Sequence, residues 1–480
     1  MESVYTSKEE VHNRAREITD IPFGNLTKLL KVAENKNSIG DIFEAWFGKN
    51  KDSSSEPDLG VAELKATPYK KLKNGQYSAK ERLVLNIINY MDIVNEDFEH
   101  SHFLYKNRVI ELAFYEYIKE IPRDEWFFSN VALYEMTKNP VDFAIIKDDW
   151  NTIQNCIKSG HAEDLTESMT NYLAACTKGA SAKSLRNQPF SDVRAKQRAF
   201  SLKSSYMTQI LRKYILGDGK TESIISDAIN LEENSLTDIL YGRFKPYIGK
   251  STLQIANMLD VTYHRTKSFN NILARGMLGL DTQSETGLEN ISELNKASYK
   301  VKTIQFDSRG VNKESMSFPS FKFKDLVTQN WTDEDGAPEA DLNILFSEST
   351  FLFVVFQLDE LGNNIFKGIK FFRVPQQDID GNIYNVWKDT VDKLKRGVQL
   401  SCGKNGRISN NFIKASDNMI IHVRPHTSKR SYVKSSNSNQ LPTPAIWKNK
   451  PAEYSIDYMT TQCFFLNNTY IKHAVIDLVN

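Results

Sequence analysis

Two carboxylates and a lysine stand close together in the segment 56–67. Asp58 follows a proline and stands two positions before Gly60, and Glu63 and Lys65 lie two residues apart farther along. In a strand, residues two apart point to the same face, so Leu64 between them should be buried on the opposite side. Two carboxylates beside an ammonium group can hold a divalent cation and a water next to a phosphate. The spacing therefore indicates metal-assisted hydrolysis of a phosphodiester.

The helix that should precede this strand carries another acid. Apolar residues at helical spacing, a serine at the expected N-cap and Gly48 as a stop predict a helix over 40–47. Glu44 neighbours its apolar stripe and could point towards the site. Since 25% of the residues are charged, a solvated edge strand with a Glu63–Lys65 ion pair is the alternative interpretation.

A helix with an acid, then Pro-Asp, then Glu-x-Lys is the core pattern of PD-(D/E)xK nucleases. The chain also contains GDIFEAWFG at 40–48, YLAACTKGA at 172–180 and the basic segment SLRNQPFSDVRAKQRAFSLKSSYM at 184–207. With these motifs it resembles the MutH-like GATC endonucleases, in particular their type II restriction enzymes, over nearly its whole length. One departure is the short segment between Asp58 and Glu63, which indicates a trimmed hairpin.

The resemblance implies Mg²⁺-dependent double-strand cleavage of DNA at GATC, 5′ to the guanine. Asp58, Glu63 and the Leu64 carbonyl would hold the metal. Lys65 would position the attacking water and offset charge on the phosphate. Glu44 would orient Lys65 or bind a second ion.

DNA-binding residues are expected in the segments that line the cleft of the family resembled. Lys178 matches the lysine that reads the recognition sequence in the major groove, where lysine can donate to guanine O6 and N7. An ordinary exposed loop lysine is the alternative. Arg186, Arg198 and Lys203 are further DNA-binding candidates on the segments that follow.

Beyond residue 300 the sequence repeats itself weakly but in fixed order. Residues 312–316 echo 79–83, and the loop 422–429 takes the place of the Lys178 loop. The copy lacks Pro-Asp and Glu-x-Lys at 300–307, so it should bind without cutting. Its basic loop supplies the candidates Arg424, His426 and Lys429.

We therefore predict an α+β fold with two tandem MutH-like (PD-(D/E)xK restriction-endonuclease-like) domains joined by a mostly helical connector. The boundaries are 1–220 for the catalytic domain, 221–293 for the connector and 294–480 for the second domain. The second domain is expected to bind an additional GATC site and activate the first.

Composition sets wider limits. The chain has 480 residues, a net charge of +1 and four widely spaced cysteines, which is typical of reduced thiols in a cytoplasmic protein. We expect no membrane partner, because no apolar run reaches the length of a membrane span. The Gly249-Lys250-Ser251-Thr252 segment lacks Walker A spacing, so no nucleotide cofactor is expected. A non-catalytic DNA-binding regulator and a MutH-type nicking endonuclease of mismatch repair are the alternatives.

Overall fold

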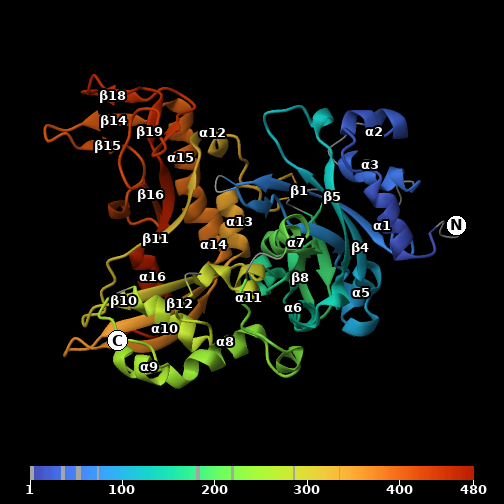
Figure 1. Cartoon of the computed structure of the whole chain (residues 1–480), viewed down its shortest axis with the longest axis horizontal. Coiled ribbons are helices and arrows are strands. Elements are labelled where there is room, and N and C mark those ends of the chain that lie inside the picture. Colours follow the sequence, from blue (N-terminus) through green and yellow to red (C-terminus); the bar gives the residue numbers. More distant parts are fainter. Residues whose placement is uncertain are drawn as a thin grey trace. The chain divides into compact units, whose positions relative to one another are not determined.

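In the computed structural model of the chain, the described residues are 5–33, 38–49, 56–72, 75–179, 184–217, 221–266, 268–284, 287–334 and 336–479. They form two units. Unit 1 is Met1–Leu240 with Glu285–Tyr299, and unit 2 is Tyr241–Ser284 with Lys300–Asn480. Figure 1 shows helices and strands throughout both, so the α+β class predicted from the sequence is correct. The segment 221–293 is divided between the units.

The first part of the chain alternates short helices with strands. In chain order these elements are α1 (Lys8–Arg16), α2 (Phe23–Leu30), α3 (Ser38–Trp46), β1 (Glu63–Lys71), β2 (Tyr77–Ala79), β3 (Leu83–Ile87), α4 (Tyr90–Ile93), α5 (His102–Asn107), β4 (Val109–Glu116), β5 (Phe128–Glu135), α6 (Pro140–Lys158), β6 (Leu173–Thr177), β7 (Leu185–Gln188), β8 (Ser191–Lys196), β9 (Arg198–Leu202), α7 (Ser204–Leu216), α8 (Leu236–Phe244) and α11 (Ser292–Lys296).

The first sheet of unit 1 contains the strand that begins at Glu63. Its order is β2-β1-β4-β5, with β1 parallel to β4 and antiparallel to β2, and β4 antiparallel to β5. Apolar residues of α1, α2 and α3 pack with those of this sheet into one core, which includes Leu64 as predicted. His12 of α1 also contacts the sheet, where its Nδ1 lies 2.9 Å from Oε1 of the buried Glu111.

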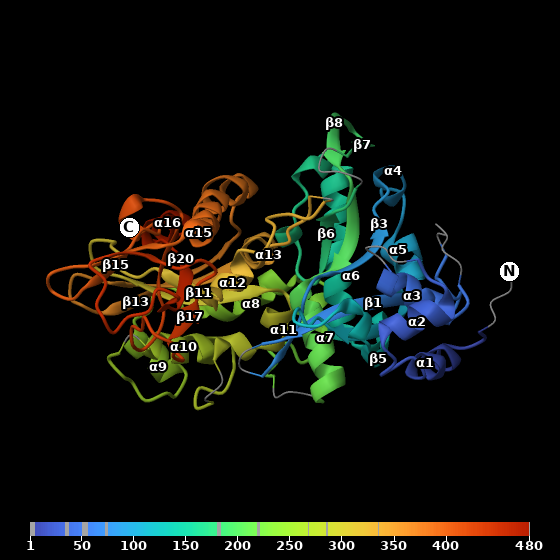
Figure 2. The same ribbon diagram turned by 90° about the horizontal axis from the view of Figure 1, so that it is seen from above.

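A second, antiparallel sheet of unit 1 has the order β3-β9-β6. Helix α6 begins at Pro140, because Asn139 caps it by accepting a hydrogen bond from the Asp142 amide and the proline suits the first turn. The hairpin of β7 and β8 projects at the edge of the unit (Figure 2). Phe190 at its tip is 74% exposed.

The segment 285–299 returns to unit 1 after the chain has entered unit 2. Lys296 Nζ lies 2.8 Å from Oδ1 of the buried Asp142. The Ser205 hydroxyl donates to the Lys296 carbonyl at 2.8 Å, and the Tyr299 hydroxyl donates to Asn171 Oδ1 at 2.9 Å. Polar contacts with buried partners therefore bind this segment into unit 1.

The remaining helices and strands begin with those of the first excursion into unit 2. They are α9 (Thr252–Met258), α10 (Phe269–Met277), β10 (Tyr299–Phe306), β11 (Met316–Phe321), α12 (Phe323–Leu326), α13 (Asp341–Glu348), β12 (Thr350–Leu358), β13 (Asn364–Phe372), α14 (Gln376–Asp378), α15 (Tyr384–Arg396), β14 (Gln399–Cys402), β15 (Ile408–Asn410), β16 (Ile421–Pro425), β17 (Ser438–Gln440), β18 (Ile446–Lys448), β19 (Tyr458–Thr460), β20 (Gln462–Leu466) and α16 (Asn468–Ala474).

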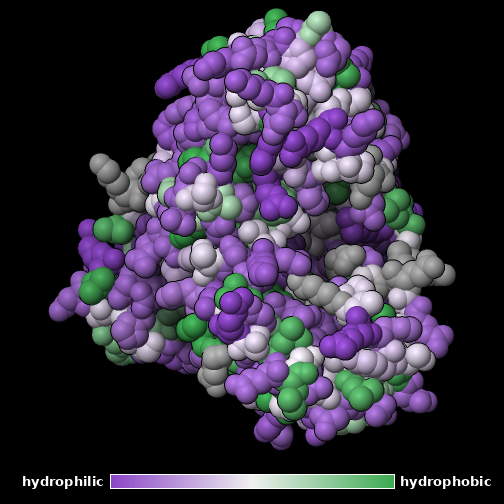
Figure 3. Space-filling view, turned by 90° about the vertical axis from the view of Figure 1, so that its left-hand side faces the viewer, coloured by the Kyte–Doolittle hydropathy of each residue, from purple (hydrophilic) through white to green (hydrophobic). Residues whose placement is uncertain are grey.

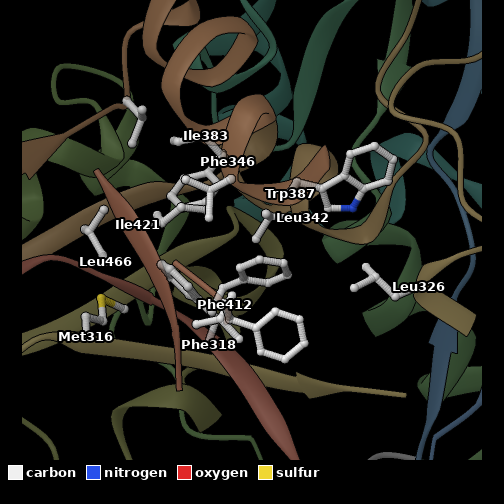
Figure 4. Close-up of a cluster of buried hydrophobic side chains, with 14 of the residues drawn as sticks. Met316, Phe318, Leu326, Leu342, Phe346, Ile383, Trp387, Phe412, Ile421 and Leu466 are labelled. Carbon is white, nitrogen blue, oxygen red and sulfur yellow. The ribbon is translucent and has the colours of Figure 1, made fainter. Parts of the chain in front are cut away.

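Unit 2 has two principal sheets, with the orders β10-β12-β13 and β11-β20-β16. Its core joins these sheets to α13 and α15, and Figure 4 shows Phe346, Trp387 and Leu466 in one cluster of buried side chains. The face of the molecule in Figure 3 is mainly hydrophilic, with its hydrophobic residues scattered. Among the helices in the described ranges, none is long and apolar enough to cross a membrane.

Candidate active site

A tight turn before β1 brings the two predicted metal-binding carboxylates together. The Leu59 amide donates to the Ala62 carbonyl at 3.0 Å, and Gly60 adopts the left-handed φ of +73° that this turn requires. The Asp58 amide donates to Glu63 Oε2, and the Leu64 amide donates to Asp58 Oδ2, each at 3.1 Å. Glu63 thus accepts a hydrogen bond from the backbone of Asp58, and Asp58 accepts one from the residue that follows Glu63. These two bonds fix the carboxylates relative to each other.

Three lysines contact this pair of acids. Lys65 Nζ lies 2.5 Å from Glu63 Oε1, as expected for neighbours on one strand face. Lys106, from the last turn of α5, lies 3.9 Å from the same oxygen, and Lys49 lies 3.6 Å from Asp58 Oδ1. Glu63 is only 2% exposed, so the interpretation of a solvated edge-strand pair is wrong.

Glu44 lies on α3, within electrostatic range of Asp58, Lys65 and Glu63. Burial raises the pKa of Glu44, and the charge of Asp58 raises it further. Burial also raises the pKa of Glu63, against the opposing effect of Lys65. Carboxyl groups held this way favour a neighbouring cation, because it compensates a charge that burial penalises.

The donor set fits a hard divalent cation. Carboxylate oxygens are the ligands that Mg²⁺ prefers, and the two acids are already held together by their backbone hydrogen bonds. Leu64 lies between Glu63 and Lys65 on the strand, with its side chain buried in the core. A role for the Leu64 carbonyl stays a prediction.

The structure separates the four DNA-binding candidates of unit 1 into two classes. Lys178 lies just past the end of β6, its amide donating to the Gln197 carbonyl at 2.9 Å, and Arg186 is exposed on β7. Arg198 is buried and donates through Nη1 to the Ala175 carbonyl at 3.0 Å. Lys203 is 1% exposed and donates to the Thr170 carbonyl.

The side chains of Arg198 and Lys203 therefore stabilise the folded unit and are not part of an exposed DNA-binding surface. A cation buried on a carbonyl oxygen satisfies a backbone acceptor that water cannot reach. Reaching a DNA groove would require both side chains to leave these partners. We therefore propose base or phosphate contacts only for Lys178 and Arg186.

The candidates of unit 2 lie at the end of β16 and just beyond it. Arg424, His426 and Lys429 are all exposed. The Arg424 guanidinium lies 4.4 Å from the centre of the Phe465 ring, and His426 meets the same ring edge-on at 5.8 Å. Stacking on an aromatic face orients the guanidinium without burying it.

Lys49 is a residue of the site that sequence reasoning missed. Its signal was present in Gly48, which was interpreted only as a helix stop. A glycine just past a helix end commonly reverses the chain direction, so the side chain after it can be returned towards the helix. A basic residue in that position next to a catalytic helix is a candidate for the same site.

Comparisons with known proteins found a matching family model and proteins of similar sequence. The family model of the DNA mismatch repair enzyme MutH matches residues 47–149, which include Asp58, Glu63, Lys65 and Lys106. The chain is 50% identical over 491 residues to the type II restriction enzyme Sau3AI of Staphylococcus aureus, and the alignment covers 100% of both chains. It is 23% identical over 225 residues to the DNA mismatch repair protein MutH of Pasteurella multocida (strain Pm70), covering 44% of this chain and 98% of that relative.

Proposed function

Because the chain belongs to the type II restriction enzyme family that includes Sau3AI, and is thus a site-specific deoxyribonuclease, we propose that it cuts both DNA strands at GATC, 5′ to the guanine. The observation that carries the catalytic assignment is the mutual fixing of Asp58 and Glu63 beside Lys65. The GATC sequence and the cleavage position rest on the resemblance of the motifs to the MutH-like endonucleases.

We propose Mg²⁺ as the cofactor, held by Asp58, Glu63 and the Leu64 carbonyl. When bound, Mg²⁺ would lower the pKa of a bound water and neutralise charge on the phosphate. Lys65 positions the attacking water and stabilises the negative charge that develops on the phosphate. Glu44 orients Lys65 or helps to hold a second ion. Burial of Glu63 strengthens each of these electrostatic interactions.

We further propose that unit 2 is a second MutH-like domain. The main sheets support this, because β1-β4-β5 and β3-β9-β6 of unit 1 have the same relative orders as β10-β12-β13 and β11-β20-β16 of unit 2. The second sheet is antiparallel throughout in both units. Strand order of this kind is a property of the fold and is independent of surface composition.

Individual residues support the same correspondence. Leu83 and Leu173 both pair with Leu202 of β9, while Met316 and Ile421 both pair with Leu466 of β20. In this register Met316 corresponds to Leu83, the same pair that the sequence repeat aligns, which supports the proposal.

If the two units correspond in this way, His426 is the counterpart of Lys178. The amide of His426 donates to the Thr461 carbonyl at 3.2 Å, as that of Lys178 does to the Gln197 carbonyl. The basic loop of unit 2 would therefore correspond to the Lys178 loop of unit 1, which is proposed to contact the bases of the recognition sequence. Since β10 lacks the Pro-Asp and Glu-x-Lys residues, unit 2 would bind a second GATC site and activate unit 1 without cutting.

Digestion of plasmid DNA tests the cutting activity. We expect linear product with Mg²⁺ and none with EDTA, and sequencing of the fragment ends should locate each cut 5′ to the guanine of GATC. Nicked circles alone would favour the mismatch-repair alternative. Uncut but bound plasmid would favour the non-catalytic regulator.

Substrates with one or two GATC sites test the activator. We expect faster cutting per site with two sites, and rescue of the one-site substrate by a short GATC duplex. Changing Arg424 and Lys429 together to Ala should remove the stimulation and spare slow one-site cutting. Equal rates per site would contradict the activator, because coupling between two sites must change the rate or affinity at one of them.

A further inference from the structure

The end of α3 has a specific geometry that determines where Lys49 lies. Gly48 has a left-handed φ of +74°, and its amide donates to the Ala45 carbonyl at 3.0 Å. The Lys49 amide donates to the Glu44 carbonyl at 3.1 Å. These two bonds form a Schellman motif, in which the residue after the glycine is tied back to the last turn of the helix. The backbone of Lys49 is thus bonded to that of the catalytic candidate Glu44.

The Lys49 side chain reaches one particular oxygen of the site. Its Nζ lies 3.6 Å from Asp58 Oδ1, and both side chains are 13% exposed. The other oxygen, Asp58 Oδ2, accepts the hydrogen bond from the Leu64 amide. One carboxylate oxygen of Asp58 therefore accepts a hydrogen bond from the strand, and the other faces the ammonium of Lys49.

A divalent cation on Asp58 would have to share this oxygen with the Lys49 ammonium. Two positive groups a few ångströms apart repel each other, most strongly where solvent access is low. DNA changes the balance, because a backbone phosphate beside the site attracts an ammonium that has left Asp58. The same lysine can thus oppose the metal before DNA binds and favour the substrate afterwards.

We propose that Lys49 is a further positioning and DNA-binding residue of the active site, which occupies Asp58 before the metal binds and moves to a DNA phosphate when the metal takes that carboxylate. The inference rests on the Mg²⁺ dependence proposed above. It makes metal binding and DNA binding mutually favourable, since coupling between two ligands is reciprocal. The enzyme would then assemble its metal site mainly on DNA.

The test compares Lys49→Met with the matched control Lys28→Met, which replaces an exposed lysine of α2. Calorimetric titration with Ca²⁺ in the absence of DNA should show about tenfold tighter binding to Lys49→Met and no change for the control. DNA binding in Ca²⁺, measured by fluorescence anisotropy across a salt series, should lose about one unit of its log–log salt slope. Lys49→Arg should retain the wild-type slope because it keeps the charge.

Each half of the inference can fail separately from the proposed function. Unchanged or weaker Ca²⁺ binding to Lys49→Met would mean that Lys49 merely supports Asp58, and would overturn the competition with metal. An unchanged salt slope would overturn the phosphate contact. Either result could occur while the wild-type chain still cuts GATC with Mg²⁺, whereas failure of that cutting would refute the proposed function itself. Circular dichroism melting curves verify that the compared variants are folded.

Discussion

Replacing Lys203 by methionine distinguishes a buried structural cation from a DNA-binding one. Its ammonium donates to the Thr170 carbonyl. Burial raises the pKa of Asp149, which is 1% exposed, to about 7, and the charge of Lys203 opposes that rise. Asp149 in turn accepts hydrogen bonds from the backbone amides of residues 171, 172 and 173, at 2.6, 2.6 and 2.9 Å. Lys203 is therefore part of the network that fixes the start of β6.

The size of the effect follows from these contacts. Lys203→Met leaves a buried carbonyl without this donor and a buried carboxylate without its neighbouring cation. Breaking such an arrangement from one side costs about 3 kcal/mol. At roughly 2–4 °C per kcal/mol for a unit of this size, the melting temperature of unit 1 should fall by about 6–12 °C. Lys158→Met, at an exposed position on α6, should leave it unchanged.

The assay pairs thermal unfolding with DNA binding measured below the melting temperature. We expect the salt dependence of GATC-duplex affinity to match that of the wild type, since a buried cation releases no phosphate counterion. A normal melting temperature together with a salt slope lower by about one unit would refute this reasoning. It would restore Lys203 to the DNA interface.

Four further substitutions test the site and its supports. Glu63→Ala or Lys65→Ala should slow single-turnover cleavage at least about 10²-fold while GATC binding persists; wild-type rates would exclude the catalytic assignment. Lys178→Ala should lower discrimination against near-cognate sites by about 1–3 kcal/mol in competition cleavage, whereas equal weakening on all sequences would indicate a phosphate contact. Burial raises the pKa of Glu111 from 4.5 to about 8, so its contribution to stability is present below pH 4.5 and is lost as pH rises to about 8. Glu111→Gln should flatten that decline in urea unfolding, and an unaltered profile would assign it to another group.

The centre of the site could be predicted because its geometry is local. Asp58, Glu63 and Lys65 lie within eight positions of one another, where a turn and the two-residue period of a strand determine which side chains meet. Their burial and their partner Lys106 depend on β1 lying beside β4. That pairing spans distant parts of the chain, and no local pattern specifies it.

The two candidates at the ends of β9 show that a positive charge alone does not predict a DNA contact. Arg198 and Lys203 flank the buried residues 199–202, and a basic residue near a predicted cleft was interpreted as a DNA contact. Whether such a cation faces solvent or a buried carbonyl depends on the loops that pack over it. The acceptors here, Ala175, Leu165 and Thr170, lie more than 20 residues away in sequence.

The route of the chain has a consequence for biosynthesis. Residues 285–299 complete unit 1, and Lys296 supplies the ammonium that pairs with the buried Asp142. A nascent polypeptide that ends at residue 220 already contains every side chain proposed to be catalytic but lacks this last segment. During translation the nuclease unit can thus close only after its first excursion into unit 2 has been synthesised. A chain cut short before residue 285 lacks the segment that completes the cutting unit.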